Sequence, residues 1–168
     1  MKKLIVTGAL LLLAPALAPA QVADHQYRVE GYLFIGQGTY PTRPGLLGIG
    51  HVGGGGEVLL FKGLSVESEA GAMGRPGYGV GLFSVDASYR LLPSRSKSKV
   101  VPFVEGGYTR AFGNWGFTYS ENLINFGGGI HYWPFKRVGM RLEVRDYVDH
   151  APWGLDHYPA LRIAFTLR

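Results

Sequence analysis

The chain has 168 residues, no cysteine, 26 glycines and a formal net charge of +5 at pH 7, and 13% of its residues are aromatic. The lack of cysteine excludes a disulfide framework and thiol chemistry, and a mild positive charge without a long basic stripe gives no reason to expect nucleic acid as a partner. A disordered glycine-rich chain would be poor in aromatic residues. We therefore expect a folded protein built mostly from strands.

The first 20 residues, MKKLIVTGALLLLAPALAPA, have the pattern of a secretory signal peptide: two lysines, an apolar run and small residues that fit a cleavage site. Pro15 and Pro19 interrupt the apolar run before the ~20 residues that a spanning helix needs, which disfavours a retained membrane anchor. The sequence predicts removal of residues 1–20, export of the protein, and one domain over residues 21–168.

Eight segments with alternating apolar and polar residues then follow, each bounded by turn residues. In the clearest one, Met140, Leu142 and Val144 fall on one face, whereas Arg141 and Glu143 fall on the other. Most of the segments are long enough to cross a bilayer as tilted strands, which takes about 9–11 residues. The predicted strands cover residues 25–36, 48–61, 64–74, 79–92, 99–111, 122–134, 138–149 and 157–168.

The second segment begins GIGHVGGGG at Gly48 and contains a G-x-G-x-x-G match. A dinucleotide site needs a strand before the first glycine and a helix after the last, and neither is expected here, because glycine costs about 1 kcal/mol in a helix. We interpret these glycines, and those at 106–107 and 127–129, as strand positions where the bend of a small barrel or long interior Arg and Tyr side chains need an absent Cβ.

The connectors of the predicted strands are of two kinds. Those after the second, fourth and sixth segments hold every lysine of the mature chain, whereas QGTYPTRPGLL, GRPGY, FGNWGFTYSEN and APWGLDHY are mostly longer and richer in aromatic residues and glycine. An even number of strands with short turns at one end and longer loops at the other is typical of outer-membrane barrels. Alternation alone also fits a soluble sandwich or a lipocalin-like barrel, so that alternative stays open.

In a closed eight-stranded barrel the charged strand faces point inward, where side chains fill the space and buried charges must pair. The fold class predicted is therefore all-β, an eight-stranded antiparallel up-and-down transmembrane β-barrel. The predicted interior ion-pair network consists of Arg28, Glu30, Glu57, Glu67, Glu69, Asp86, Arg90, Glu105, Arg141, Glu143, Arg145 and Arg162.

Aromatic residues near the predicted strand ends indicate interfacial girdles of Trp and Tyr, with ordinary core packing as the alternative. They are Tyr27, Tyr32, Tyr40, Tyr78, Tyr89, Tyr108, Trp115, Tyr119, Tyr132, Trp133, Tyr147, Trp153 and Tyr158.

The whole mature chain resembles the small outer-membrane β-barrel proteins, the OmpA/OmpX/OmpW-like group. PFVEGGYTRAFG at 102–113, NFGGGIHYWPFKRVGMRLEVRDYV at 125–148 and the final YPALRIAFTLR carry the resemblance, together with the signal peptide. Proteins of this group usually end in an aromatic residue that the assembly machinery reads, whereas this chain ends in Arg168. The resemblance implies a fold and an outer-membrane location and no particular activity, because the group is functionally mixed.

We expect a monomer with a structural, envelope-integrity or surface-interaction role, in contact with outer-membrane lipid, lipopolysaccharide and the assembly machinery, with no cofactor. A narrow channel for small solutes and a lipid A-modifying enzyme are the alternatives. The enzyme would need a lipid-facing His beside a Ser and a carboxylate, and no H-x-S-N pattern surrounds any histidine. A divalent-ion site in the last loop, among Asp146, Asp149, His150, Asp156 and His157, and acid/base work by Glu67 and Glu69 are further alternatives, weighed against a solvated loop and an interior ion-pair network.

Overall fold

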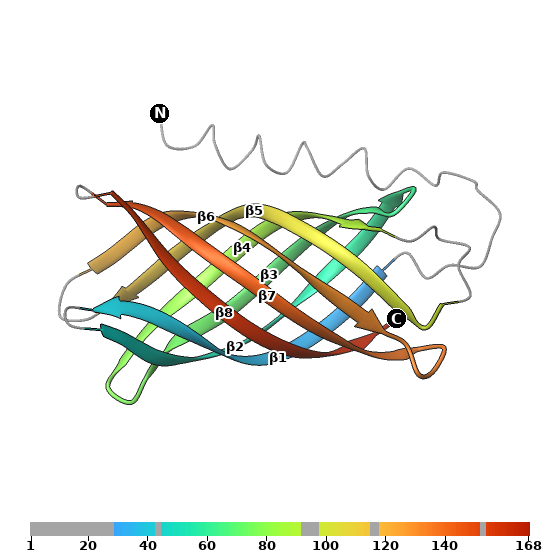
Figure 1. Ribbon diagram of the computed structural model, residues 1–168, viewed down its shortest axis with the longest axis horizontal. Helices are drawn as coiled ribbons and strands as arrows, with labels where there is room; N and C mark the ends of the chain where they lie inside the picture. The colour runs from blue at the N-terminus through green and yellow to red at the C-terminus, as the bar shows by residue number, and fades with distance from the viewer. Residues whose placement is uncertain (1–28, 43–44, 92–97, 115–117, 152–153) are drawn as a thin grey trace.

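The computed structural model describes residues 29–42, 45–91, 98–114, 118–151 and 154–168. Eight strands form one closed barrel in which each strand is hydrogen-bonded to its neighbours in sequence and β1 also pairs with β8. Every pairing is antiparallel, and the strands run obliquely to the long axis of the barrel (Figure 1). The predicted fold class is therefore confirmed. Within the part of the chain described, no helix is long and apolar enough to cross a membrane.

The strands are β1 (Val29–Thr42), β2 (Gly45–Phe61), β3 (Leu64–Arg75), β4 (Tyr78–Arg90), β5 (Val100–Asn114), β6 (Thr118–Tyr132), β7 (Val138–Ala151) and β8 (Gly154–Leu167). The start of β1 and the end of β8 lie at the same end of the barrel, which we call the terminal end; we call the opposite end the far end. The predicted signal peptide and Arg28 fall outside the described residues.

The prediction of longer loops at the far end is wrong. The odd-numbered strands end later and the even-numbered strands begin earlier than expected, so that β1 ends at Thr42 and β2 begins at Gly45. The longest gap between strands, from Arg90 to Val100, lies at the terminal end instead. Continued ladder pairing gives the backbone N–H and C=O groups of these segments their partners, which the turn-like residue composition did not reveal.

The alternation of side chains sorts the barrel wall into a charged inner face and an apolar outer face. In β7, Arg141, Glu143 and Arg145 are buried inside the barrel, whereas Met140 and Leu142 are exposed on the outside. The same pattern holds in β8, whose burial alternates residue by residue up to Leu167. Exposed large apolar side chains on all eight strands give the barrel an outer surface that a protein in water would not keep.

The glycine tract of β2 makes room for aromatic side chains of β1 inside the barrel. A Cβ at Gly53 would lie 2.6 Å from Phe34 Cζ, and a Cβ at Gly55 would lie 2.8 Å from the Tyr32 hydroxyl oxygen and 2.5 Å from the Ser68 carbonyl oxygen. These distances are too short for any side chain. The strand interpretation of the tract is therefore correct, and the side chains that need the space here are Tyr32 and Phe34.

The girdle prediction is wrong for three of the aromatic residues. Tyr32, Trp133 and Tyr147 are buried inside the barrel, because their positions in the strands fall on the inner face. Tyr89, Tyr108 and Tyr132 are exposed on the outer face as a girdle requires; the half-buried Tyr158 packs against the apolar core cluster. No side-chain placement is described for Tyr27, Tyr40, Tyr78, Trp115, Tyr119 and Trp153.

Two neighbouring glycines provide a matched test of this packing. We expect Gly55→Ala to lower the free energy of unfolding in detergent micelles by about 1–3 kcal/mol, since the new Cβ overpacks the site between β1 and β3. Gly56→Ala should change it by less than about 0.5 kcal/mol, because the nearest atom to its Cβ, the Glu30 carbonyl oxygen, is 3.6 Å away. Equal effects in denaturant titrations of the two variants would contradict this account.

Candidate functional site: the filled barrel interior and the outer polar groups

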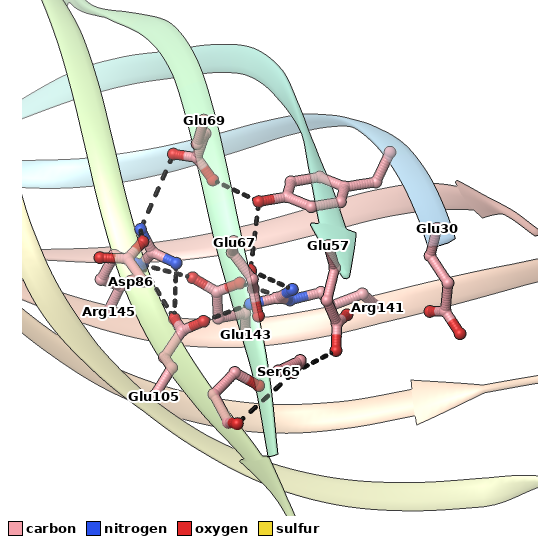
Figure 2. A network of polar contacts seen from close by, with 12 residues as sticks. Glu30, Glu57, Ser65, Glu67, Glu69, Asp86, Glu105, Arg141, Glu143 and Arg145 are labelled. Atoms are coloured by element: carbon pink, nitrogen blue, oxygen red, sulfur yellow. Dashed lines mark hydrogen bonds and ion pairs between the residues drawn. The ribbon is translucent and has the colours of Figure 1, made fainter. Parts of the chain in front are cut away.

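The centre of the barrel interior holds a group of charged side chains that we call the central layer. Its members are Tyr32, Glu67, Glu69, Asp86, Glu105, Arg141, Glu143, Arg145 and Arg162, and all of them are buried. They come from β1, β3, β4, β5, β7 and β8, so strands from all sides of the barrel meet here (Figure 2).

Arg141 and Arg145 bind carboxylates from several strands. Arg141 contacts Glu67 Oε2 at 2.8 Å and Glu143 Oε2 at 2.7 Å, and it also pairs with Glu105. Arg145 binds Glu105, Glu143 and Asp86 at distances of 2.8 to 2.9 Å. Each guanidinium therefore ties strands together across the interior, and these contacts add to the backbone ladder that links only neighbouring strands.

Arg162 and the neutral Tyr32 complete the central layer, and Asn125 borders it. Arg162 Nη1 lies 2.6 Å from Glu69 Oε1, and its Nη2 pairs with Glu143. The Tyr32 hydroxyl donates to Glu67 and Glu69, and the neighbouring Asn125 donates its amide N–H to Asp86 at 2.7 Å. Glu143 is the one carboxylate of the layer that contacts all three arginines.

The central layer has fewer cationic than acidic side chains. Its three arginines face five carboxyl groups, namely Glu67, Glu69, Asp86, Glu105 and Glu143. Loss of a guanidinium would therefore leave more carboxylates without a counter-ion, whereas neutralising a carboxylate would reduce the excess. Because the dielectric constant in such an interior is low, this difference has a large effect on stability.

The terminal end of the interior is closed by a second ion pair and a set of rings. Arg90 lies 2.9 Å from both Glu30 and Glu57, and Ser65 donates to Glu57 at 2.6 Å. His131 lies between Phe103 and Trp133, with ring centroids 4.7 and 6.3 Å away.

The C-terminal Arg168 covers this set of rings. Its guanidinium carbon lies 3.8 Å from the centroid of Trp133, and its Nε donates to the Lys136 carbonyl oxygen at 3.0 Å. Arg168 thus joins the end of β8 to the segment between β6 and β7.

The far side of the central layer is covered by apolar side chains. Met73, Leu82, Ala111, Leu123, Tyr147 and Ala160 form one buried cluster, against which Ile49, Val80 and Tyr158 pack. His51 lies beside this cluster, with its ring in contact with Phe34 and Tyr147. The charged groups are therefore enclosed by rings on one side and apolar side chains on the other, which is the arrangement of a filled barrel.

Two groups of polar side chains lie on the outer face of the barrel. Asp146 of β7 and His157 of β8 approach to 2.6 Å between Oδ2 and Nδ1. On β5 and β6, Asn122 Oδ1 accepts hydrogen bonds from the Tyr108 hydroxyl at 2.5 Å and from the guanidinium of Arg110. These five residues make the side-chain hydrogen bonds and the ion pair described on the outer face, where single polar residues such as Gln37 and His150 also lie.

The positions of these polar residues give little support to an enzymatic role or to a metal site. Asp146 and His157 form a carboxylate–imidazole pair, but no Ser or Thr hydroxyl of the described residues hydrogen-bonds to His157, as a hydrolytic triad would require. Among these same residues, no three His, Asp or Glu side chains come together in a way that could hold a metal ion. Glu67 and Glu69 are engaged with Tyr32 and arginines inside the barrel, where a polysaccharide cannot reach them.

Sequence reasoning did not identify His51 and His131 as interior residues. Their rings are buried and contact aromatic rings, and their nitrogens have no hydrogen-bond partner among the described residues. Both fall on inward positions of the alternation in β2 and β6, and this period-2 pattern is the signal that could have located them.

Several solved barrels have this fold. Neisserial surface protein A matches with a TM-score of 0.65 and 12% identity over 86% of this chain and 99% of its own. The N-terminal barrel domain of Pseudomonas aeruginosa OprF matches with a TM-score of 0.61 and 17% identity, over 83% and 96%. The Pseudomonas aeruginosa outer membrane protein OprG matches with a TM-score of 0.55 and 6% identity, over 88% and 100%. No protein-family model and no curated protein matches the sequence. At these identities the similarity shows the fold, which is that of small outer-membrane barrels.

The charge balance of the central layer can be tested with two substitutions. We expect Arg141→Met to lower the free energy of unfolding by about 3–5 kcal/mol, because it leaves buried carboxylates without their counter-ion. Glu105→Gln keeps an acceptor for Arg141 and Arg145 and reduces the excess of carboxylates, so its cost should be less than half as large. Denaturant titration in detergent micelles measures both, and Lys136→Met at the exposed terminal end is the control.

Proposed function

We propose that the chain is an integral outer-membrane protein, exported by its first 20 residues, with a structural, envelope-integrity or surface-interaction role. The observation that carries this proposal is the pairing of an apolar outer face with an interior filled by the central layer. Such a barrel is stable in a bilayer, where its outer face meets acyl chains, and it has a rigid wall with no need for a ligand inside.

The partners that follow from this location are lipids and the assembly machinery. The outer face would contact phospholipid near the terminal end and lipopolysaccharide near the far end, and the last strand would present Phe165 and Leu167 to the machinery that inserts barrels. Because β1 pairs with β8 of the same chain, the sheet has no open edge to which a second copy could add a strand. This closure supports a monomer.

The membrane proposal predicts heat-modifiable migration. The protein extracted in mild detergent should run on a denaturing gel as a compact band when unboiled and as a slower or otherwise distinct band after boiling, since a closed barrel resists the detergent until it is heated. It should also sediment with outer membranes. A single band and release in the soluble envelope fraction would contradict the proposal and favour a soluble β-barrel.

The enclosed central layer argues against the alternative of a solute channel. Conduction needs a continuous water-filled path past Arg141, Arg145 and Arg162, and these residues are at most 1% exposed. We expect no discrete conductance steps from the folded protein in planar bilayers under conditions in which a porin conducts. Reproducible unitary steps that change size in Arg145→Ala would instead place the current inside this barrel and overturn the plugged-interior proposal.

A further inference from the structure

Arg110 is a cation on the outer face of the barrel wall. Its neighbours in β5, Thr109 and Ala111, are buried inside the barrel, whereas Tyr108 and Phe112 are exposed outside, and Arg110 shares their side of the strand. A guanidinium facing the middle of a bilayer would cost about 2–4 kcal/mol, and this cost falls to nearly zero at the membrane boundary. The depth of Arg110 therefore decides what it can do.

The register of β5 places Arg110 at the far boundary of the apolar belt. It follows Val100, the first residue of β5 at the terminal end, by ten positions. At about 3.3 Å per residue and a tilt of about 35–45°, ten residues rise about 25 Å along the barrel axis, which equals the height of the apolar band of such barrels. His157 lies equally far from Leu167 at the end of β8, so the two outer polar groups are at similar heights.

The two outer polar groups differ in charge compensation. His157 has its own carboxylate, Asp146, at 2.6 Å. Among the described residues, Arg110 has no carboxylate partner; its partner is the neutral Asn122, whose Oδ1 it shares with Tyr108. Asn122 can orient the guanidinium but cannot neutralise it, and one acceptor leaves most of the five N–H donors of an arginine free.

We infer that Arg110, oriented by Asn122 and flanked by Tyr108, binds the phosphate group of an outer-leaflet glycolipid. A guanidinium binds phosphate through two parallel N–H···O bonds, and the exposed rings of Tyr108 and Phe112 provide surface for the sugar and the first acyl carbons. The depth of the site and these rings select a lipid phosphate over a free anion. This inference rests on the proposed membrane location, which it extends by naming one lipid contact.

The test uses the mature protein folded in zwitterionic detergent micelles that carry increasing amounts of diphosphoryl lipid A. Native mass spectrometry counts retained lipid, and the midpoint of thermal unfolding reports its binding. We expect the wild type to retain lipid A and to be stabilised by it, and to respond at least tenfold more weakly to the dephosphorylated lipid. In Arg110→Gln the apparent affinity for lipid A should fall about tenfold, since the charge-assisted bonds to phosphate are lost.

Three variants serve as comparisons. Lys136→Gln removes one exposed positive charge at the terminal end and should bind lipid A as the wild type does. Arg110→Lys keeps the positive charge but cannot bind phosphate in the bidentate geometry of a guanidinium. Its apparent affinity for lipid A should lie between those of the wild type and Arg110→Gln. Asn122→Leu removes the acceptor that orients Arg110 and should weaken binding severalfold, so it tests the site even where Arg110→Gln does not fold.

Several results would overturn the inference. If the apparent affinity of Arg110→Gln for lipid A stays within twofold of the wild type, the proposed site is wrong. The same holds for Asn122→Leu where only that variant folds. Displacement of lipid A by millimolar inorganic phosphate would show a bare anion site with no lipid contribution. A wild type without a heat-modifiable compact band would contradict the membrane proposal itself, whereas a compact band with unchanged lipid binding in the variants contradicts only the site.

Discussion

A closed barrel of eight strands is too narrow to hold a wide water-filled interior, so every charged side chain that points inward must find its counter-ion there. This requirement accounts for the central layer, in which Arg141, Arg145 and Arg162 bind carboxylates from strands that are far apart in the sequence. Two neutral donors add to these ion pairs. The Tyr32 hydroxyl donates to the Glu67 oxygen that Arg141 also binds, and the Asn125 amide donates to the Asp86 oxygen that Arg145 does not contact. The apolar outer face follows from the same alternation, because each inward polar residue places its neighbours outside.

Closure of the sheet also determines the structure of the far end of the barrel. Towards the far end, small and polar residues such as Gln37, Gly50 and Asn122 lie on the outer face together with large apolar ones such as Phe112 and Leu155. In the described part of the chain, the far end is made of paired strand rather than long loops. Groups on a paired strand are held more rigidly than groups on a loop, so contacts made there depend on the register of the ladder.

The period-2 pattern was sufficient to predict the number of strands, their order and which face of each strand is charged. It predicted the strand ends poorly at the far end, because Gly, Pro and Asn there indicate turns while the ladder continues through them. The individual ion pairs could not be predicted. The contact between Arg141 and Glu67 depends on the registers of several successive strand pairs, and the sequence does not give these registers. Tyr32 and Trp133 have residue types that are typical of a girdle, but their positions in the alternation place them inside the barrel, because position decides which side of the wall a side chain occupies.

The arginines of this barrel show how location determines the use of one residue type. Arg141 and Arg145 are fully enclosed, and each is bound by several carboxylates, because a buried cation without a partner would destabilise the fold by several kcal/mol. Arg168 at the terminal end is partly exposed; its guanidinium stacks on Trp133 and lies 3.7 Å from a carboxylate oxygen of Glu30. Arg110 faces outward and is held by a neutral amide alone among the described residues. A guanidinium in that environment keeps its capacity to bind an anion from outside the protein, and in the proposed membrane location the anion at its height is lipid phosphate.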